Sequence, residues 1–279
     1  MYERYLRQLV IAVLWCTVAT FAAADSASVE YVIDWVNNRL TINAEAPVPD
    51  QQRNRAAARQ QTTRDLENRL PQFLSEGVLL VTVDAEHRIG ESTAANTAVL
   101  QHIAEIFSAG SREYSRLHDD LRRVQLRYHV PLQPAILAPL ISQDRARPVP
   151  RRLGWTPRAE YSGILIYAAA QDTRGALLPR IVDRTGTVYH DYSALDPDLL
   201  MQRGMVLYSD TPGSLAVTER VGASPRRVTS IAVSGSHGTD IVLSDEDIHA
   251  LLSTPSTRAA LRQGRVAVIL HPDHVFDRY

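Results

Sequence analysis

The sequence predicts an α+β protein with two mixed α/β-layer domains and no Rossmann or P-loop element. Two observations lead to this prediction. Segments that alternate apolar and polar residues, typical of half-buried strands, are interspersed with segments whose apolar residues recur every three or four positions, typical of helices. An arginine- and proline-rich stretch at residues 143–158 divides the rest into an N-terminal domain at 25–142 and a C-terminal domain at 159–279.

Composition is that of a soluble globular protein. The chain has 279 residues, of which 45% are hydrophobic and 22% are charged, and its formal net charge is −1. Such a small net charge gives no global field toward nucleic acid, and we expect no nucleic-acid partner. All 30 basic residues are arginine, which excludes a P-loop lysine and a Schiff-base lysine.

Residues 1–24 have the pattern of a cleavable export signal. Arg4 and Arg7 precede an apolar run at residues 9–21, which is short for a membrane-spanning helix. Small residues then meet the requirement of signal peptidase, so we expect the mature chain to begin at residue 25. The cleavage site consists of Ala22, Ala24 and Asp25.

Two other fates of this segment stay open, a retained anchor and lipidation. Lipidation would modify Cys16, the only cysteine, but the bulky Trp15 stands where a lipoprotein signal needs a small residue. The mature chain would have no cysteine, and therefore no disulfide and no thiolate chemistry.

In the first half, alternation and turn residues predict a hairpin followed by helices and further strands. Asn37 and Asn38 tolerate the positive φ of a tight turn. Pro71 is expected to limit or kink the first helix, and Gly77 to open the next strand. The expected elements are strands at 29–35 and 39–44, a helix from about 51 to 73, a strand at 78–83, a helix at 92–109 and a strand at 121–132.

The stretch at residues 143–158 is expected to be a linker or a covering loop, because its prolines oppose both helix and sheet. An alternative is a docking patch for an anionic partner such as peptidoglycan, lipid headgroups or an acidic protein. Peripheral contact with a membrane therefore stays open. The basic residues concerned are Arg145, Arg147, Arg151 and Arg152.

In the second half, Gly186 supplies the positive φ of a short hairpin, and Ser244 opens a capping box. Pro255 is expected to start the last helix and Gly264 to end it. The expected elements are strands at 163–170, 180–182, 187–189, 205–208, 228–234, 240–243 and 265–270, a short helix or turn at 198–203, and helices at 245–252 and 255–263.

Three clusters resemble chemical sites, and each has a simpler interpretation. Ser236 and His237 are neighbours in a turn, so their side chains point apart rather than form a nucleophile and base. His271 and His274 form a close pair in a tail that we expect to fray, although a metal site is the alternative. The carboxylates at 245–247 cap a helix, with divalent-cation binding as the alternative. We predict no catalytic residue, no metal site and no cofactor.

The motif at residues 239–247 is the candidate structural or binding site. Its residues are Thr239, Asp240, Ser244 and Asp247. Asp240 begins a strand directly after a glycine turn, so we expect its carboxylate to accept N–H bonds from the turn at 235–238. Alternation places Asp240 and Val242 on one face and Ile241 on the other. A role of Asp240 in ligand binding is the alternative.

An ordered set of short segments in the second half points to a known group of proteins. These segments are 162–166, 179–183, Gly186, 188–189, 202–206, Tyr208, 220–222, Pro225, 239–244 and Asp247. In these segments the second half resembles a group of bacterial envelope proteins that includes the flagellar protein FlgT and related motility lipoproteins. The first half follows the layout of that group more loosely. One departure is that residues 167–170 read Tyr-Ala-Ala-Ala where the group commonly has Asp-Ala-Arg-Gly, so no role of that Asp or Arg carries over.

This resemblance implies a non-enzymatic exported protein, a structural or assembly factor of the periplasm or the outer-membrane periphery that is linked to flagella, motility or the outer membrane. It would bind a protein partner of the envelope, including a flagellar one. The alternative is an envelope hydrolase whose site assembles from distant residues, for example with His237 or His190. Convergent titratable groups in a pocket would favour the hydrolase, whereas shallow polar surfaces and an exposed sheet edge would favour binding.

Overall fold

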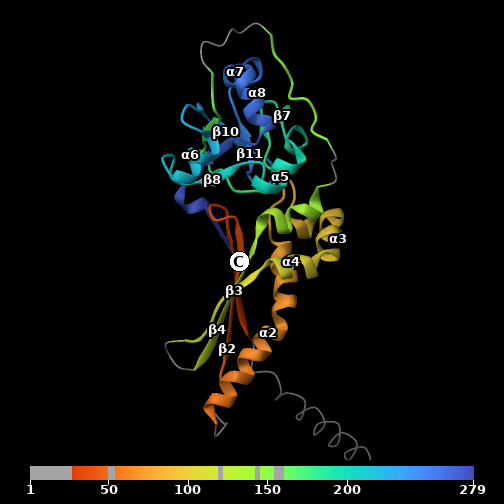
Figure 1. Cartoon of the computed structure of the whole chain (residues 1–279), viewed down its shortest axis with the longest axis vertical. Helices are drawn as coiled ribbons and strands as arrows, with labels where there is room; N and C mark the ends of the chain where they lie inside the picture. The colour runs from red at the N-terminus through yellow and green to blue at the C-terminus, as the bar shows by residue number, and fades with distance from the viewer. Residues whose placement is uncertain (1–26, 50–53, 119–121, 142–144, 154–159) are drawn as a thin grey trace, which may run out of the picture.

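A computed structural model describes residues 27–49, 54–118, 122–141, 145–153 and 160–279. The segment predicted as an export signal, with Ala22, Ala24 and Asp25, lies outside these residues. The molecule is elongated, with the N-terminal half at one end and the C-terminal half at the other (Figure 1). Both halves combine helices with sheets, which confirms the α+β prediction. None of the helices described is both long and apolar enough to cross a membrane.

The N-terminal half is built on a five-stranded antiparallel sheet in the order β13-β1-β2-β4-β3. The expected first hairpin is present, and Asn38 in its turn has a φ of 54°. The strands are β1 (Ser28–Asp34), β2 (Arg39–Pro47), β3 (Ser111–Leu117), β4 (Arg123–Pro131) and β13 (Phe276–Arg278).

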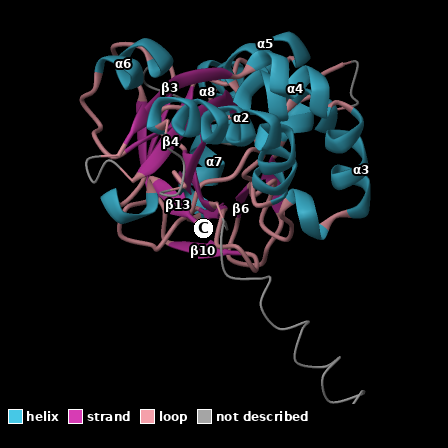
Figure 2. Ribbon diagram, turned by 90° about the horizontal axis from the view of Figure 1, so that it is seen from below, coloured by secondary structure: helices cyan, strands magenta, loops and turns pink. Residues whose placement is uncertain are grey.

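One face of this sheet is covered by α2 (Arg55–Leu79), which packs on β2 and β4. Helices α2, α3 and α4 lie to one side of β3 and β4 when the molecule is seen from below (Figure 2). The apolar side of α2 is buried, and includes Leu66, Leu70, Phe73, Leu74 and Val78. The remaining helical segments of this half are α3 (Thr93–Gln101), α4 (Ile103–Ala109), η1 (Ile89–Glu91), η2 (Leu132–Ile136) and η3 (Ala138–Leu140).

The strand predicted at residues 78–83 is wrong, because α2 continues to Leu79. Pro71 lies inside the helix, where the apolar side remains in register and keeps packing on the sheet. Gly77 does not open a strand. A Cβ atom at Gly77 would come within 2.8 Å of Cδ1 of Tyr31, so glycine is needed there for close approach of α2 to β1. The helix predicted at 92–109 is divided at His102, where φ is −103° and ψ is 12°.

The C-terminal half contains a parallel sheet in the order β8-β12-β5-β9 and a mixed sheet in the order β10-β11-β6-β7. The strands of the parallel sheet are β5 (Ile164–Tyr167), β8 (Leu207–Ser209), β9 (Arg226–Thr229) and β12 (Val266–Ile269). Those of the mixed sheet are β6 (Ile181–Val182), β7 (Val188–His190), β10 (Ala232–Ser234) and β11 (Asp240–Val242). The helical segments are η4 (Tyr192–Ala194), α5 (Pro197–Arg203), α6 (Leu215–Val221), α7 (Asp245–Ser253), α8 (Pro255–Arg262) and η5 (Pro272–His274).

Local signals in this half predict its turns and caps correctly. Gly186 has a φ of +83° in the β6–β7 hairpin, and Ser244 caps α7. The strand expected at 228–234 is instead two strands, β9 and β10, in different sheets. The chain leaves the parallel sheet at Ser230, whose hydroxyl donates to the carbonyls of Ala232 and Val242.

The two halves are joined by more than the connecting segment. The C-terminal tail that we expected to fray forms β13, which pairs with β1 of the other half. Backbone N–H groups of Leu177 and Leu178 bond to the carbonyls of Thr82 and Val83. Trp35 packs edge-on against Tyr208 with a centroid separation of 5.9 Å. One hydrophobic core therefore runs through both halves.

Candidate functional site

Strand β3 forms an open edge of the five-stranded sheet among the strands described. The N–H of His118 bonds to the carbonyl of Arg123, which fixes the alternation along the β3–β4 pair. Since hydrogen-bonded and non-hydrogen-bonded pairs alternate in an antiparallel ladder, Arg116 bonds to β4 while Ser115 and Leu117 do not. The backbone N–H and C=O groups of Ser115 and Leu117 therefore point away from the sheet.

This edge is longer than the other outer strands described. Strand β3 has seven residues, whereas β13, β7, β10 and β8 have three each and β9 has four. Short outer strands are one way in which proteins prevent edge-to-edge association. The length of β3 makes it the strongest candidate in the described structure for pairing with another chain.

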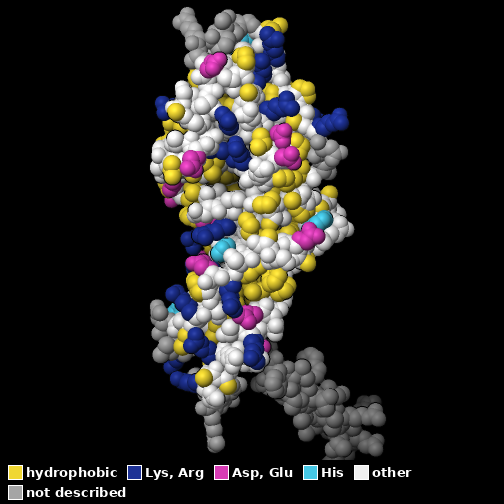
Figure 3. Space-filling model, in the orientation of Figure 1, with side chains coloured by type: hydrophobic (Ala, Val, Ile, Leu, Met, Phe, Trp, Pro, Cys, Tyr) yellow, Lys and Arg dark blue, Asp and Glu magenta, His cyan; other side chains and the backbone are white. Residues whose placement is uncertain are grey.

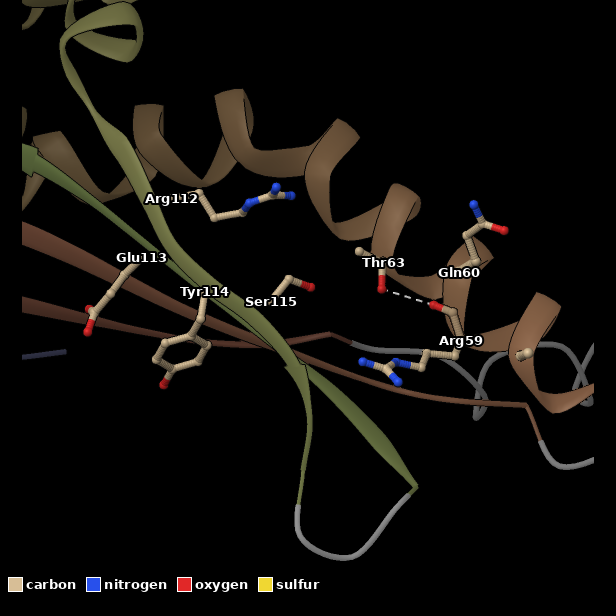
Figure 4. A pocket seen from close by; sticks show the side chains of 8 residues that line it. Arg59, Gln60, Thr63, Arg112, Glu113, Tyr114 and Ser115 are labelled. Carbon is tan, nitrogen blue, oxygen red and sulfur yellow. Dashed lines mark hydrogen bonds between the residues drawn. The ribbon is translucent and has the colours of Figure 1, made fainter.

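A groove of about 760 Å³ separates β3 from the N-terminal half of α2. In Figure 4, the side chains of Arg112 and Ser115 point from β3 toward α2, whereas Glu113 and Tyr114 lie on the other side of the strand. The facing wall is a single helical surface of α2. Its residues are Ala56, Arg59, Gln60 and Thr63.

The groove is polar and basic. Arg112 forms an ion pair with Glu67 on α2, but no carboxylate of the described residues pairs with Arg59. On the opposite face of β3, the guanidinium groups of Arg116 and Arg127 lie 4.8 and 5.0 Å from the ring centroid of Tyr114. Basic side chains recur over the lower half of the molecule, where this hairpin and α2 lie (Figure 3).

Features that restrain edge pairing are also present. The register of β3 against β4 shifts between Arg112 and Tyr114, which makes Glu113 a bulge. Bulges and charged side chains protect edges from indiscriminate association. The open part of the edge is therefore limited to the segment from Tyr114 to Leu117.

A second polar cleft, of about 340 Å³, lies where the two halves meet. At its base, Asp277 accepts a hydrogen bond of 2.8 Å from Nε1 of Trp35. Burial raises the pKa of Asp277, and the Trp35 hydrogen bond and nearby cations oppose that rise. The cleft is lined by Thr82, Arg88, Arg174, Ser236, His237, Phe276, Asp277, Arg278 and Tyr279.

Ser236 and His237 line this cleft but do not bond to each other. The hydroxyl of Ser236 donates to the carbonyl of Ala85 at 3.1 Å, while Nε2 of His237 lies 2.8 Å from a carboxylate oxygen of Glu91. Residues 235–238 form the turn that the sequence predicts. The arrangement anchors the turn to the N-terminal half rather than placing a base beside a nucleophile.

His190, the other histidine considered for a hydrolase, is fully enclosed. Burial lowers its pKa to about 4, so the ring is neutral at pH 7. Neither ring nitrogen has a hydrogen-bond partner among the described residues. His190 therefore forms no catalytic pair in the part of the chain that the structure describes.

Asp240 has a different partner from the one that we predicted. Its carboxylate accepts hydrogen bonds from the backbone N–H and the guanidinium of Arg180, not from the turn at 235–238. All three residues of β11, Asp240, Ile241 and Val242, are buried. Both faces of β11 are covered in the folded chain, so both apolar and polar positions lose contact with solvent.

The rest of this motif lies at the start of α7 rather than beside Asp240. The Ser244 hydroxyl accepts from the N–H of Asp247 at 3.1 Å and donates to the Asp247 carboxylate at 2.9 Å. Asp247 also lies 3.6 Å from the guanidinium of Arg226. Thr239 is fully buried. These residues hold the fold together and do not form a common surface.

The four arginines of the connecting segment do not act as one group. Arg145, Arg147 and Arg151 are exposed, whereas Arg152 stacks on the ring of Tyr189 and donates to its hydroxyl at 2.7 Å. The backbone N–H of Arg147 bonds to the carbonyl of Ser193. The segment is thus tied to the surface of the C-terminal half at two points.

Comparison with known protein families gives two matches. Residues 26–139 match the model of the N-terminal domain of Treponema pallidum Tp0624, and residues 163–272 match that of its second domain. The chain is similar to the first two domains of Tp0624. The interval between the matches contains the arginine- and proline-rich segment. No curated protein matches the chain.

The similarity to Tp0624 covers both halves of the fold, including β3 and α2 in the first match. Among the residues described, no group of three or more His, Cys, Asp or Glu side chains is placed to hold a metal ion.

The open edge of β3 was missed by our sequence analysis. Each face of β3 mixes polar and apolar residues, Tyr114 with Arg116 and Ser115 with Leu117, so period-two patterning gives little signal for this strand.

Proposed function

We propose that the protein is an exported, non-enzymatic component of the cell envelope that binds a protein partner, as a structural or assembly factor. The observation that carries this proposal is the edge of β3, where Ser115 and Leu117 direct backbone donors and acceptors outward beside a groove. An extended segment of a partner can add to such an edge as a further strand. Backbone hydrogen bonds then provide affinity, and the groove provides selectivity.

The place of action is proposed from the sequence. The signal-like segment at residues 1–24 supports export to the periplasm or the outer-membrane periphery. The link to flagella or motility is supported by the resemblance to the FlgT group. Intact-mass measurement of the protein from its native host tests export. A mature chain that begins at Asp25 is expected, and a full-length or Cys16-lipidated product would contradict cleavage.

The rival function is a hydrolase in the cleft between the two halves, favoured by the titratable groups that converge there. Their contacts argue against it. His237 is engaged by Glu91, Asp277 by Trp35, and Ser236 by a backbone carbonyl. A base that is already oriented by a carboxylate would need a nucleophile within hydrogen-bond reach, and Ser236 is turned elsewhere.

Photocrosslinking in the native host tests binding at the edge. A photoreactive residue at Glu113, beside the open edge, should crosslink to a discrete partner. The same residue at Gln61, which is exposed on α2 but outside the groove lining, is the control and should not. Ser115→Pro removes one outward N–H and should suppress the Glu113 crosslink. Equal crosslinking at both positions, or none at Glu113, would contradict the proposal.

A further inference from the structure

We infer that the β3 edge selects an extended peptide segment that carries acidic side chains on the face toward α2. The inference rests on the proposed binding function and specifies the chemistry of the partner. It follows from the directions of the side chains around the edge and from the charges of the groove.

The pleat of the sheet determines where the side chains of an added strand would point. Ser115 and Leu117 pair with Leu126 and Val124, which are buried on the side of α2. An added strand lies about 4.8 Å from its neighbour, with its side chains alternating between the same two faces. Every second side chain of the partner would therefore enter the groove between β3 and α2.

The α2 wall of that groove offers a positive charge that no carboxylate among the described residues neutralises. Arg59 is exposed and, within the described residues, has no carboxylate partner. Its neighbours on the wall, Gln60 and Thr63, are uncharged hydrogen-bonding groups. A carboxylate that enters beside them would form a charge-assisted hydrogen bond with Arg59. A lysine or arginine there would instead face an uncompensated cation.

The face of β3 that points away from α2 also favours acidic over basic side chains. Arg116 and Arg127 flank Tyr114 on that face, and Arg127 is only 3.8 Å from the Glu113 carboxylate. Glu113 marks the bulge at which a regular ladder must stop. The favoured partner is thus a short segment opposite Ser115 and Leu117, rather than a long strand that passes the bulge.

The backbone pattern distinguishes a peptide from other polyanions. Lipid headgroups and nucleic acids would also be attracted to Arg59 and Arg116, but neither matches alternating N–H and C=O groups along an edge. Binding to an acidic peptide should therefore depend on both the backbone of β3 and the charge of α2. Binding to a polyanion should depend on charge alone.

Fluorescence anisotropy with the full mature chain and a labelled synthetic peptide of alternating Glu and Thr tests this inference. Ser115→Pro and Arg59→Glu should each weaken binding by at least about tenfold, roughly the loss of one good interaction. The matched controls are Ser115→Ala, which keeps the N–H, and Arg64→Glu, which makes the same charge change outside the groove lining. Both should stay within about twofold of the original protein.

A second measurement does not depend on any variant folding. A peptide with the same side chains but methylated at alternate backbone nitrogens cannot complete the ladder and should bind at least about tenfold more weakly. A peptide with Lys in place of Glu should also bind at least about tenfold more weakly than the original peptide. Equal binding of the Glu and Lys peptides, or binding that survives N-methylation in both alternations, would overturn the inference.

The failures of the two proposals can be told apart. If Glu113 crosslinks a partner in cells while the acidic peptide shows no preference over the lysine peptide, the charge selectivity is wrong and edge binding stands. If neither occurs, edge binding is wrong as well. Binding of anionic vesicles or oligonucleotides that is lost in Arg59→Glu but kept in Ser115→Pro would identify a polyanion site and overturn the inference.

Discussion

The guanidinium of Arg180 holds the carboxylate of Asp240 at the junction of β6 and β11. Nε of Arg180 lies 2.9 Å from Oδ2 and 3.1 Å from Oδ1, and the backbone N–H of Arg180 lies 3.2 Å from Oδ1. The Asp240 side chain is only 3% exposed, whereas that of Arg180 is 33% exposed. The pair therefore joins a buried acceptor to a partner that stays in contact with solvent, beside the parallel pairing of Ile241 with Ile181.

Removing the Asp240 carboxylate should destabilise the C-terminal half. We expect Asp240→Ala to lower the free energy of unfolding by about 1–3 kcal/mol, since it removes the buried acceptor of the Arg180 backbone N–H and guanidinium. Asp240→Asn keeps an acceptor and should cost less. Urea denaturation monitored by circular dichroism measures both effects. If neither variant changes stability but both abolish capture of a partner, Asp240 belongs to the binding surface.

A double-mutant cycle measures the interaction free energy between Arg180 and Asp240 apart from their contacts with other residues. Arg180→Met combined with Asp240→Ala should be less destabilising than the sum of the two single substitutions, because each single change leaves one charged group without its partner. Additive effects would mean that the two side chains contribute independently.

The Arg180–Asp240 pair also shows what the sequence could and could not predict. The hairpin at Asn38, the turn at Gly186 and the cap at Ser244 depend on residues within a few positions of one another, and all three were predicted. The partner of Asp240 stands 60 residues away and is brought there by parallel strand pairing. No local pattern specifies such a neighbour.

The same reason explains the errors at Gly77 and at the C-terminal tail. Gly77 resembles a strand opener locally, but its role is to let α2 approach Tyr31. The tail at Phe276 resembles a frayed end until β1 supplies a partner strand. For the proposed binding edge, no local pattern in the sequence indicates that α2 would leave a groove beside β3.

His190 should make stability depend on pH in the weakly acidic range. Its pKa in the folded protein is about 4, below the ordinary value of 6.5, because burial opposes the charged form. The unfolded chain therefore takes up a proton first as the pH falls. Stability should be full above about pH 6.5 and should decline between pH 6.5 and 4, by at most about 1.4 kcal/mol per pH unit.

Chemical denaturation at a series of pH values checks this dependence. His190→Gln, which does not titrate, should flatten the decline relative to the original protein, whatever its effect on stability at pH 7. His249→Gln is a control on α7, for a histidine that is not fully buried. A decline that is unchanged in His190→Gln would show that other groups produce it.

The contribution of Asp277 to stability should depend on pH in the opposite sense to that of an ordinary carboxylate in an ion pair. Burial raises its pKa in the folded protein, so its contribution to stability is present at low pH and is lost as the pH rises through that pKa. Asp277→Asn keeps an acceptor for Nε1 of Trp35 and removes a buried charge. We expect its melting temperature at pH 7 to equal or exceed that of the original protein.

The matched variant Asp277→Ala loses the acceptor and should be less stable than Asp277→Asn by about 1–2 kcal/mol, because the buried indole N–H is left unsatisfied. Thermal denaturation at pH 7 and pH 4 compares them. A clear loss of stability in Asp277→Asn would mean that the charges of Arg88 and Arg174 stabilise the ionised form more than burial penalises it.

Cutting the connecting segment should not separate the two halves. Arg145 and Arg151 are exposed and should be cut early by trypsin, while Arg152 is partly shielded by Tyr189 and should be cut later. Both fragments should appear on a denaturing gel. They should nevertheless elute together in size-exclusion chromatography, because the contacts between the halves do not pass through this segment.

Those contacts are the pairing of Val32 with Arg278, the bonds from Leu177 and Leu178 to the loop after α2, and a continuous hydrophobic core. Deleting residues 276–279 before the cut removes the β1–β13 pairing and provides the comparison. That nicked variant should dissociate at a lower urea concentration than the nicked original chain. Spontaneous separation of the nicked original chain would show instead that the connecting segment holds the two halves together.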